Sequence, residues 1–223
     1  MDSFVIKKKK ELEDNKPVNI YTDGACTNNG KPDARAGFGV WFGKDDERNV
    51  SQSFSGTQTN NVAELLAIVK ALTIMREKIE KGQKITIHSD SSYSIRCCTT
   101  YGEKCEKKGW KKKGGPIPNL EIVQTAYGFC KKYRNIKFEH VKAHTGLEDE
   151  HSIGNDNADR LANLAIGVKS CPYQRLKNIY LKVPYEEKDE AKKMGAKWDT
   201  KKKKWYITPK NKYKVQMMGR WGS

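Results

Sequence analysis

The sequence predicts an α/β domain with a mixed five-stranded sheet flanked by helices, followed by a small α+β module. Three short strand-like segments separated by Gly, Asn and Asp come first, which is typical of an antiparallel meander. Later strand-like segments alternate with segments of helical periodicity, which indicates parallel pairing. Residues 178–223 hold 13 Lys and Arg against 5 Asp and Glu, and this concentration of positive charge marks them as a separate unit.

The strands of the main domain are predicted from apolar, β-branched and aromatic residues bounded by turn residues. The five strand-like segments lie, in chain order, at residues 18–23, 36–42, 49–56, 84–90 and 136–144. Two of them, the first and the fourth, end on an aspartate.

The helices are predicted from apolar residues at spacings of three and four. Residues 60–79 are the clearest case, with Asn60 placed as a cap and an apolar stripe formed by Val62, Leu65, Val69 and Leu72. A short helix after the fourth strand and a longer one at residues 119–133 follow. The last helix is expected at residues 154–167, with Asn155 near its cap.

Residues 101–118 interrupt this alternation. They contain few apolar residues and a dense basic run around Trp110. We therefore expect the segment to be exposed.

The domain organisation follows from changes in composition. We expect a polar, disordered tail, a main domain, a linker and a small basic module, at residues 1–16, 17–167, 168–177 and 178–223. In the module, the pattern indicates a strand, a short helix and two aromatic segments joined by a lysine turn. So small a unit needs its large side chains inside, so Trp198 and Trp205 are expected to form its core.

Composition limits the class of protein. No apolar stretch approaches the roughly 18 residues of a membrane span, and no signal peptide is expected, which predicts a soluble protein of the cytoplasm or nucleus. The six cysteines lack C-x-x-C spacing and are expected to be free thiols in a reducing compartment.

The charge of the whole chain indicates a polyanionic partner. Lys and Arg outnumber Asp and Glu by 43 to 27, which gives a net charge of +16. An anionic membrane surface is a weaker alternative, because no basic amphipathic helix with a large apolar face is present. Nucleic acid is therefore the expected partner.

Acidic side chains stand out on so basic a chain. If the first and fourth strands are parallel neighbours, Asp23 and Asp90 emerge at the same edge of the sheet. Glu64 lies at the margin of the apolar stripe of its helix, and Asp159 lies in the last helix. Each residue alone has an ordinary alternative, such as a strand cap for Asp23. Together they provide hard oxygen ligands suited to Mg²⁺.

Six motifs carry a resemblance to a known family. They are "YTDGACTNNG", "AGFGVWFG", "QTNNVAELLAIVKAL", "IHSDSSYSI", "GWKKKG" followed by "PNLEIV", and "VKAHTG…GNDNADRLAN". Their order and spacing over about residues 18–167 resemble type I ribonuclease H, the nuclease that cuts the RNA strand of RNA–DNA hybrids. The resemblance implies a ribonuclease H-like fold.

The resemblance also implies a catalytic set. In the family, two Mg²⁺ ions, which Mn²⁺ can replace, cut the RNA and leave 5′-phosphate and 3′-hydroxyl ends. The matching metal ligands are Asp23, Glu64, Asp90 and Asp159. His144 matches a mobile histidine that assists proton transfer or product release, and an ordinary loop histidine is the alternative.

Residues for substrate recognition are implied in the same way. Discrimination of RNA depends on the 2′-hydroxyl, which donates and accepts hydrogen bonds. Positions for the RNA strand are matched by Gly24, Asn29, Asn60 and Asn61, with Gly24 leaving room for the RNA backbone. A phosphate pocket for the DNA strand is matched by Thr59 and Asn119, and Thr57 stands where the family usually has arginine.

The basic segment corresponds to the family's substrate handle, in which lysines meet phosphates and aromatic rings pack on sugars. The matching residues are Tyr101, Trp110, Lys111 and Lys112, whereas Cys105 stands where tryptophan is common. A solvated loop with one packed tryptophan is the alternative.

The C-terminal module resembles a small module of uncharacterised function found beside primase- or topoisomerase-like domains. Its expected nucleic-acid contacts are Lys201, Lys202, Lys203, Lys204, Trp198 and Trp205. A second site tethered in this way would raise affinity for nucleic acid, whether hybrid, DNA or RNA, and a protein partner for the module is the alternative.

Taken together, the sequence predicts a monomeric hybrid-specific endonuclease with no obligate protein partner. A hybrid-binding protein without catalysis is a second hypothesis, against which the four matching acids argue. A third keeps the fold with another substrate, as in integrases, resolvases and exonucleases, and the handle and asparagines disfavour it.

Overall fold

The computed structural model describes residues 16–143, 147, 149–168, 178–200, 202–208 and 211–222. It divides the chain into two compact units, Met1–Tyr173 and Gln174–Ser223, which we call the first unit and the C-terminal unit. The predicted tail, apart from Lys16, and the predicted linker, apart from Val168, lie outside the described residues. No helix in the described part combines the length and the apolar composition that crossing a membrane requires.

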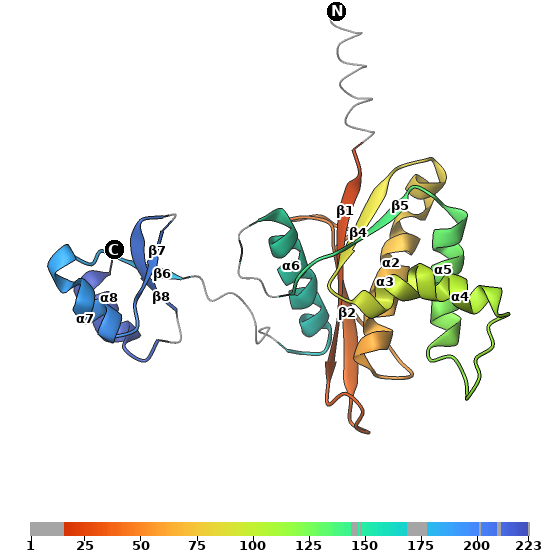
Figure 1. Cartoon of the computed structure of the whole chain (residues 1–223), viewed down its shortest axis with the longest axis horizontal. Coiled ribbons are helices and arrows are strands. Elements are labelled where there is room, and N and C mark those ends of the chain that lie inside the picture. The colour runs from red at the N-terminus through yellow and green to blue at the C-terminus, as the bar shows by residue number, and fades with distance from the viewer. Residues whose placement is uncertain are drawn as a thin grey trace, which may run out of the picture. The chain divides into compact units, whose positions relative to one another are not determined.

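The first unit is built on one mixed sheet (Figure 1). Its strands are β1 (Val18–Thr27), β2 (Arg35–Trp41), β3 (Val50–Ser53), β4 (Ile85–Ser89) and β5 (Ile136–His140), in the order β3-β2-β1-β4-β5. β1, β2 and β3 pair antiparallel, whereas β4 pairs parallel with both β1 and β5. The predicted fold class is confirmed.

Helices cover both faces of this sheet (Figure 1). They are α2 (Asn60–Glu80), α3 (Ser92–Cys98), α4 (Thr100–Lys107), α5 (Leu120–Lys132) and α6 (Glu150–Ala165). α6 lies on one face, against β1 and β2, and α2 lies on the other, with α3, α4 and α5 beside it. The main core forms between the sheet and α2, where Ile20, Ile68 and Ile87 are fully buried.

Two predicted helix caps are wrong. The cap of α2 is Thr59, whose hydroxyl accepts a hydrogen bond from the Val62 amide at 3.3 Å, and not Asn60. α6 begins before the predicted residue 154 because Asp149 caps it, accepting from the Ser152 amide at 3.0 Å. Asn155 therefore lies inside the helix.

The segment predicted to be exposed, residues 101–118 between the second and third predicted helices, is partly folded into the unit. Residues 100–107 form α4, and within the segment Gly102, Cys105 and Ile117 are buried. A side chain at Gly102 would meet the ring of Tyr127 at 2.6 Å. The close approach of α4 to α5 thus depends on a residue that carries no apolar signal, which is why the pattern missed it.

The C-terminal unit is a three-stranded antiparallel sheet with helices packed against it. Its elements are β6 (Ile179–Leu181), a 3₁₀ turn (Tyr185–Glu187), α7 (Lys188–Lys193), β7 (Lys197–Asp199), β8 (Lys204–Ile207) and α8 (Lys214–Trp221), and the strand order is β6-β8-β7. α8 was not predicted. It supplies Met217 and Trp221, four residues apart, to a core that also contains Leu181 and Ile207.

The tryptophans of this unit differ from the prediction. Trp221 is buried and Trp205 packs partly against the core, but Trp198 is 47% exposed. The expectation that Trp198 forms part of the core is therefore wrong. Trp198 lies on β7, which is an edge strand. The core position expected for it is filled by Met217 and Trp221 of α8.

Candidate active site

Two glycines bring helices close to Asp23 on both sides of the sheet. Gly24 follows Asp23 in β1, and a Cβ placed there would lie 2.4 Å from the backbone nitrogen of Glu64 in α2. Gly39 is the Cα partner of Asp23 in β2, and a Cβ there would lie 2.1 Å from the carbonyl oxygen of Ala158 in α6. Glu64 makes the first of these contacts, and Asp159 directly follows Ala158, which makes the second. Each helix therefore places an acid close to this part of β1.

Asp23 is buried, with 7% of its surface exposed. Burial raises the pKa of its carboxyl group well above the usual range, and the negative charges of Asp90, Asp159 and Glu64 raise it further. The Gly24 amide, which donates to Asp23 Oδ1 at 2.7 Å, opposes this effect. The four acids that the sequence singled out are therefore close enough for each of the other three to perturb Asp23.

Asp90 directly follows β4, and the predicted parallel pairing of the first and fourth strands is present between β1 and β4. The side-chain amide of Asn155 in α6 donates to Asp90 Oδ2 at 3.3 Å. The backbone carbonyl of Asp90 lies 3.0 Å from Nε2 of His140, at the end of β5. Asp90 is thus contacted by α6 on one face of the sheet and by the neighbouring strand β5.

Glu64 is held by three polar side chains. Its carboxylate accepts hydrogen bonds from Asn60 at 2.6 Å, from Ser94 at 3.4 Å and from Ser91. Burial raises the pKa of Glu64, the Ser91 hydroxyl lowers it, and the charge of Asp90 raises it again. These hydroxyls fix the orientation of the carboxylate.

Asp159 accepts a hydrogen bond from Asn163, one turn further along α6, at 2.8 Å. Asn155 and Asn163 therefore flank Asp159 by one turn on either side of the same helix. These asparagines, together with Ser91 and Ser94, were missed as site residues. Their positions, four residues from an acid or directly after one, allow such contacts but do not indicate which way each side chain turns.

The donor set suits a divalent cation. It consists of carboxylate oxygens, which Mg²⁺ prefers, and their mutual repulsion raises the pKa of Asp23. Among the residues that the structure describes, no three His, Cys, Asp or Glu side chains lie in a ready-made coordination arrangement. The chemistry of Asp23 and the three carboxylates that act on it still fits a metal, because hard oxygen donors are the ligands that such a cation prefers.

Two of the asparagines predicted to bind the RNA strand lie together. The side-chain oxygen of Asn29 lies 3.4 Å from the backbone nitrogen of Asn60, and Asn60 binds Glu64. Asn61 is exposed beside them. The room expected at Gly24 is filled by α2, so the glycine has a packing role there, and its contact with RNA stays a prediction.

Two residues of the predicted phosphate pocket lie at the N-termini of helices. Thr59 caps α2 and Asn119 precedes α5, and these helices pack against each other. Asn119 has a left-handed backbone, with φ of 56°, and donates to the Tyr93 hydroxyl at 3.1 Å. Thr57 is exposed and makes no hydrogen bond to either residue in the described part of the chain.

The aromatic residues of the predicted handle are packed. Tyr101 and Trp110 join a small cluster around Leu65 and Val123, and Trp110 meets the Tyr127 ring edge-on at 6.1 Å. Cys105 is buried. Lys111 and Lys112 are exposed and available to a ligand. His144 and Lys201 lie outside the described residues.

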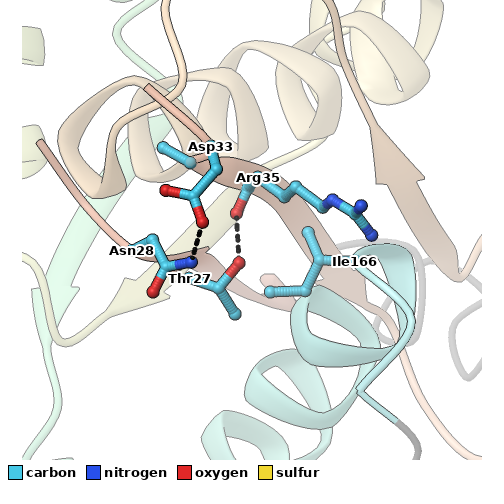
Figure 2. Close-up of a pocket in the computed structure, with 6 residues that line it drawn as sticks. Thr27, Asn28, Asp33, Arg35 and Ile166 are labelled. Carbon is cyan, nitrogen blue, oxygen red and sulfur yellow. Dashed lines mark hydrogen bonds between the residues drawn. The ribbon is translucent and has the colours of Figure 1, made fainter. Parts of the chain in front are cut away.

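A pocket of about 450 Å³ opens at the far end of β1 and is distinct from the four acids (Figure 2). It is lined by Thr27, Asn28, Asp33, Ala34, Arg35 and Ile166. Asn28 donates to Asp33 at 2.6 Å and Thr27 to the Arg35 carbonyl at 3.4 Å, which closes the β1–β2 connection. No predicted site residue lines it.

Comparison with known proteins gives two family matches. The model of the family described as RNase H matches residues 15–166. A second model, of a domain of unknown function, DUF5710, matches residues 178–222. Each match falls within one of the two units.

Curated relatives and a solved structure match the first of these regions. A ribonuclease H of Schizosaccharomyces pombe is 41% identical over 145 residues, 64% of this chain and 50% of that protein. A ribonuclease H of Hahella chejuensis is 34% identical over 154 residues, 68% of this chain and 94% of that protein. The crystal structure of LC9-RNase H1, a type 1 RNase H with the type 2 active-site motif, is 25% identical, with a TM-score of 0.52, over 71% of this chain and 76% of that one. The chain spans about half the length of the Schizosaccharomyces protein.

Proposed function

This chain belongs to the RNase H family, and from that membership we propose that it is an endonuclease that hydrolyses the RNA strand of RNA–DNA hybrids. The observation that carries the proposal is the burial of Asp23 among the charges of Asp90, Asp159 and Glu64. Such a site has no structural benefit without a cation, because like charges held together destabilise the fold. It suits an anionic substrate that brings metal ions with it.

The proposed metal ligands are Asp23, Glu64, Asp90 and Asp159, with two Mg²⁺ ions, or Mn²⁺ in their place. Bound divalent ions would activate the attacking water and stabilise the leaving oxygen, which gives 5′-phosphate and 3′-hydroxyl ends. His144, by its resemblance to the family's mobile histidine, is proposed to assist proton transfer or product release.

The polar residues around the acids are proposed to hold the ligands in place. Asn155 orients Asp90, Asn163 orients Asp159, and Ser91 with Asn60 orients Glu64. Each of these bonds fixes a carboxylate rotamer before the substrate arrives. Such preorganisation reduces the cost of assembling the site.

Recognition of the hybrid is proposed to divide between its strands. Asn29, Asn60 and Asn61 would meet 2′-hydroxyls of the RNA, because an amide can both donate to and accept from a hydroxyl. Thr59 and Asn119 would hold a phosphate of the DNA strand. Lys111 and Lys112, which are exposed, would contact the phosphate backbone.

A cleavage assay tests the proposal. The full chain is incubated with labelled RNA–DNA hybrid, double-stranded RNA or double-stranded DNA, with Mg²⁺ or with EDTA. We expect cleavage of the RNA strand of the hybrid only, and only with the metal. Cleavage of double-stranded DNA, or cleavage that EDTA leaves unchanged, would contradict it.

The C-terminal unit is proposed to add nucleic-acid affinity. Lys202 and Lys203 are exposed between β7 and β8, and Lys204 is exposed at the start of β8. Deleting residues 178–223 should therefore flatten the dependence of hybrid affinity on salt, because fewer phosphates would be neutralised. An unchanged slope in a binding titration at several salt concentrations would contradict this part of the proposal.

A further inference from the structure

Two groups of aromatic–lysine contacts in the C-terminal unit are joined by one face of α7. We call this set the aromatic–lysine stripe, and its members are Tyr185, Lys188, Lys192, Trp205 and Trp198. Lys188 Nζ lies 3.5 Å from the centre of the Tyr185 ring, and Lys192 Nζ lies 5.7 Å from that of Trp205. The rings of Trp205 and Trp198 meet edge-on, with centres 5.3 Å apart. The two lysines are four residues apart in α7, so they share one face of it.

The two ends of the stripe carry exposed rings. Tyr185 is 76% exposed and Trp198 is 47% exposed, and neither belongs to the core of the unit. A unit of this size gains most of its stability by burying large side chains, so exposing two of them has a cost. Each exposed ring leaves a face on which another flat ring can stack. Trp205 packs against the core between them and anchors the stripe.

Three acids of the unit have partners outside the stripe. Glu187 and Glu190 bind Arg220 of α8 at 3.2 and 2.7 Å, and Asp199 accepts a hydrogen bond from Tyr180 at 2.7 Å. Asp189 pairs with Lys192 at 3.3 Å, through an exposed and therefore weak contact. The stripe thus stays basic, in a unit where 13 Lys and Arg face 5 Asp and Glu over residues 178–223.

We propose that the aromatic–lysine stripe binds single-stranded nucleic acid, with Tyr185 and Trp198 stacking on bases and Lys188 and Lys192 binding phosphates. Stacking on a protein ring needs a base whose face is free, as in a single strand. In a duplex each base is already stacked on its neighbours. The stripe would therefore bind the unpaired strand that flanks a hybrid. The inference rests on the proposed function, and it adds a preference for hybrids with single-stranded ends.

Binding is tested with the full chain in EDTA, which prevents cleavage. The probes are fluorescent oligothymidylate and oligouridylate of about 12 nucleotides, within the usual range for one such site, and a blunt RNA–DNA hybrid. Anisotropy titrations compare the unaltered chain with Tyr185→Leu and Trp198→Leu. We expect each substitution to weaken single-strand binding at least about fivefold and to leave binding of the blunt hybrid unchanged, because stacking contributes about 1–3 kcal/mol per base.

Tyr213→Leu is the matched control. Tyr213 also carries a lysine over its ring, Lys212 at 4.8 Å, and is 36% exposed, but within the described residues it has no ring contact with the stripe. This control should bind as the unaltered chain does. If Trp198→Leu fails to fold by circular dichroism, Tyr185→Leu decides the question, because Tyr185 lies outside the core.

The outcomes separate the inference from the proposed function. Weakening with both oligonucleotides supports stacking on any base, and weakening with only one supports the inference and identifies the strand as DNA or RNA. Unchanged affinity in Tyr185→Leu, or equal weakening for the blunt hybrid, overturns it. Cleavage of the blunt hybrid with Mg²⁺, measured separately on the unaltered chain, tests the proposed function alone.

Discussion

Gly24 lies directly against the backbone of Glu64. A Cβ at this position would come within 2.4 Å of the Glu64 nitrogen and within 2.8 Å of Ala63. Backbone cannot move aside as a flexible side chain can, so the distance between β1 and α2 is set by the absence of a side chain here. The same contact places Glu64 of α2 beside Asp23.

Gly24→Ala should therefore push α2 away from β1. We expect a loss of about 1–3 kcal/mol in the free energy of unfolding, as for other overpacked sites, and at least about tenfold lower kcat because Glu64 is displaced. Denaturant unfolding and hybrid cleavage measure the two effects. Gly128→Ala, in α5, is the control, since a Cβ there meets nothing within 4 Å and should raise stability by about 0.5–1 kcal/mol. Equal effects of the two substitutions would contradict the packing role.

Asp23→Asn should raise stability and abolish cleavage. The substitution removes a buried charge that three other acids repel, so thermal unfolding in EDTA should occur at a higher temperature. It also removes a proposed metal ligand, while the phosphate contacts remain, so hybrid binding should survive. Addition of Mg²⁺ should stabilise the unaltered chain more than the variant. A lower unfolding temperature in EDTA would argue against repulsion at Asp23.

Asn155→Ala should weaken metal-dependent activity without removing a ligand. Asn155 is almost fully buried and donates to Asp90, so its loss leaves that carboxylate free to turn. We expect activity or apparent Mg²⁺ affinity to fall about 10- to 100-fold, which a titration of cleavage rate with Mg²⁺ would show. Asn157→Ala is the control on the same helix, because Asn157 donates to the Ile153 carbonyl instead. Equal losses in both variants would indicate a general effect on α6.

Thr57→Arg should strengthen hybrid binding. The resemblance places an arginine of the phosphate pocket at this position, and Thr57 is exposed, so the longer side chain has room. An added charge-assisted contact should lower KM several-fold, by about 1 kcal/mol or more. Ser55→Arg adds the same charge two residues away, also at an exposed position. If both variants lower KM by the same factor, electrostatic attraction between the added charge and the hybrid, and not a phosphate pocket, would be responsible.

The sheet of the first unit was predictable because its signals are local. Strand residues alternate with turn residues, α2 has a regular apolar stripe, and parallel pairing follows from the intervening helices. The same rules failed at α4 and α8. α4 packs through Gly102 and Cys105, and α8 is only eight residues long, so neither carries a long apolar stripe.

The acids of the candidate site were predictable from two facts, the strand ends and the family motifs. The side chains that hold these acids, such as Asn155 and Asn163, were not predictable, because an asparagine in a helix gives no periodic signal. Whether Asn155 turns toward Asp90 or toward solvent depends on how α6 is rotated against β1 and β4. That rotation is set by Gly39 and Gly154, against which Ala158 and the Tyr21 ring pack.

The close contact of Gly39 with α6 also bears on the order in which the protein is made. Among the described elements of the first unit, β1 is the first strand to leave the ribosome and α6 is the last helix. Chains fold as they emerge, beginning at the N-terminus. Asp159 therefore joins Asp23 only after nearly the whole unit has been synthesised. A nascent chain that has completed the sheet but not α6 has three of the four acids and an uncovered face on β2. Translation must pass α6 before the candidate site can contain all four acids.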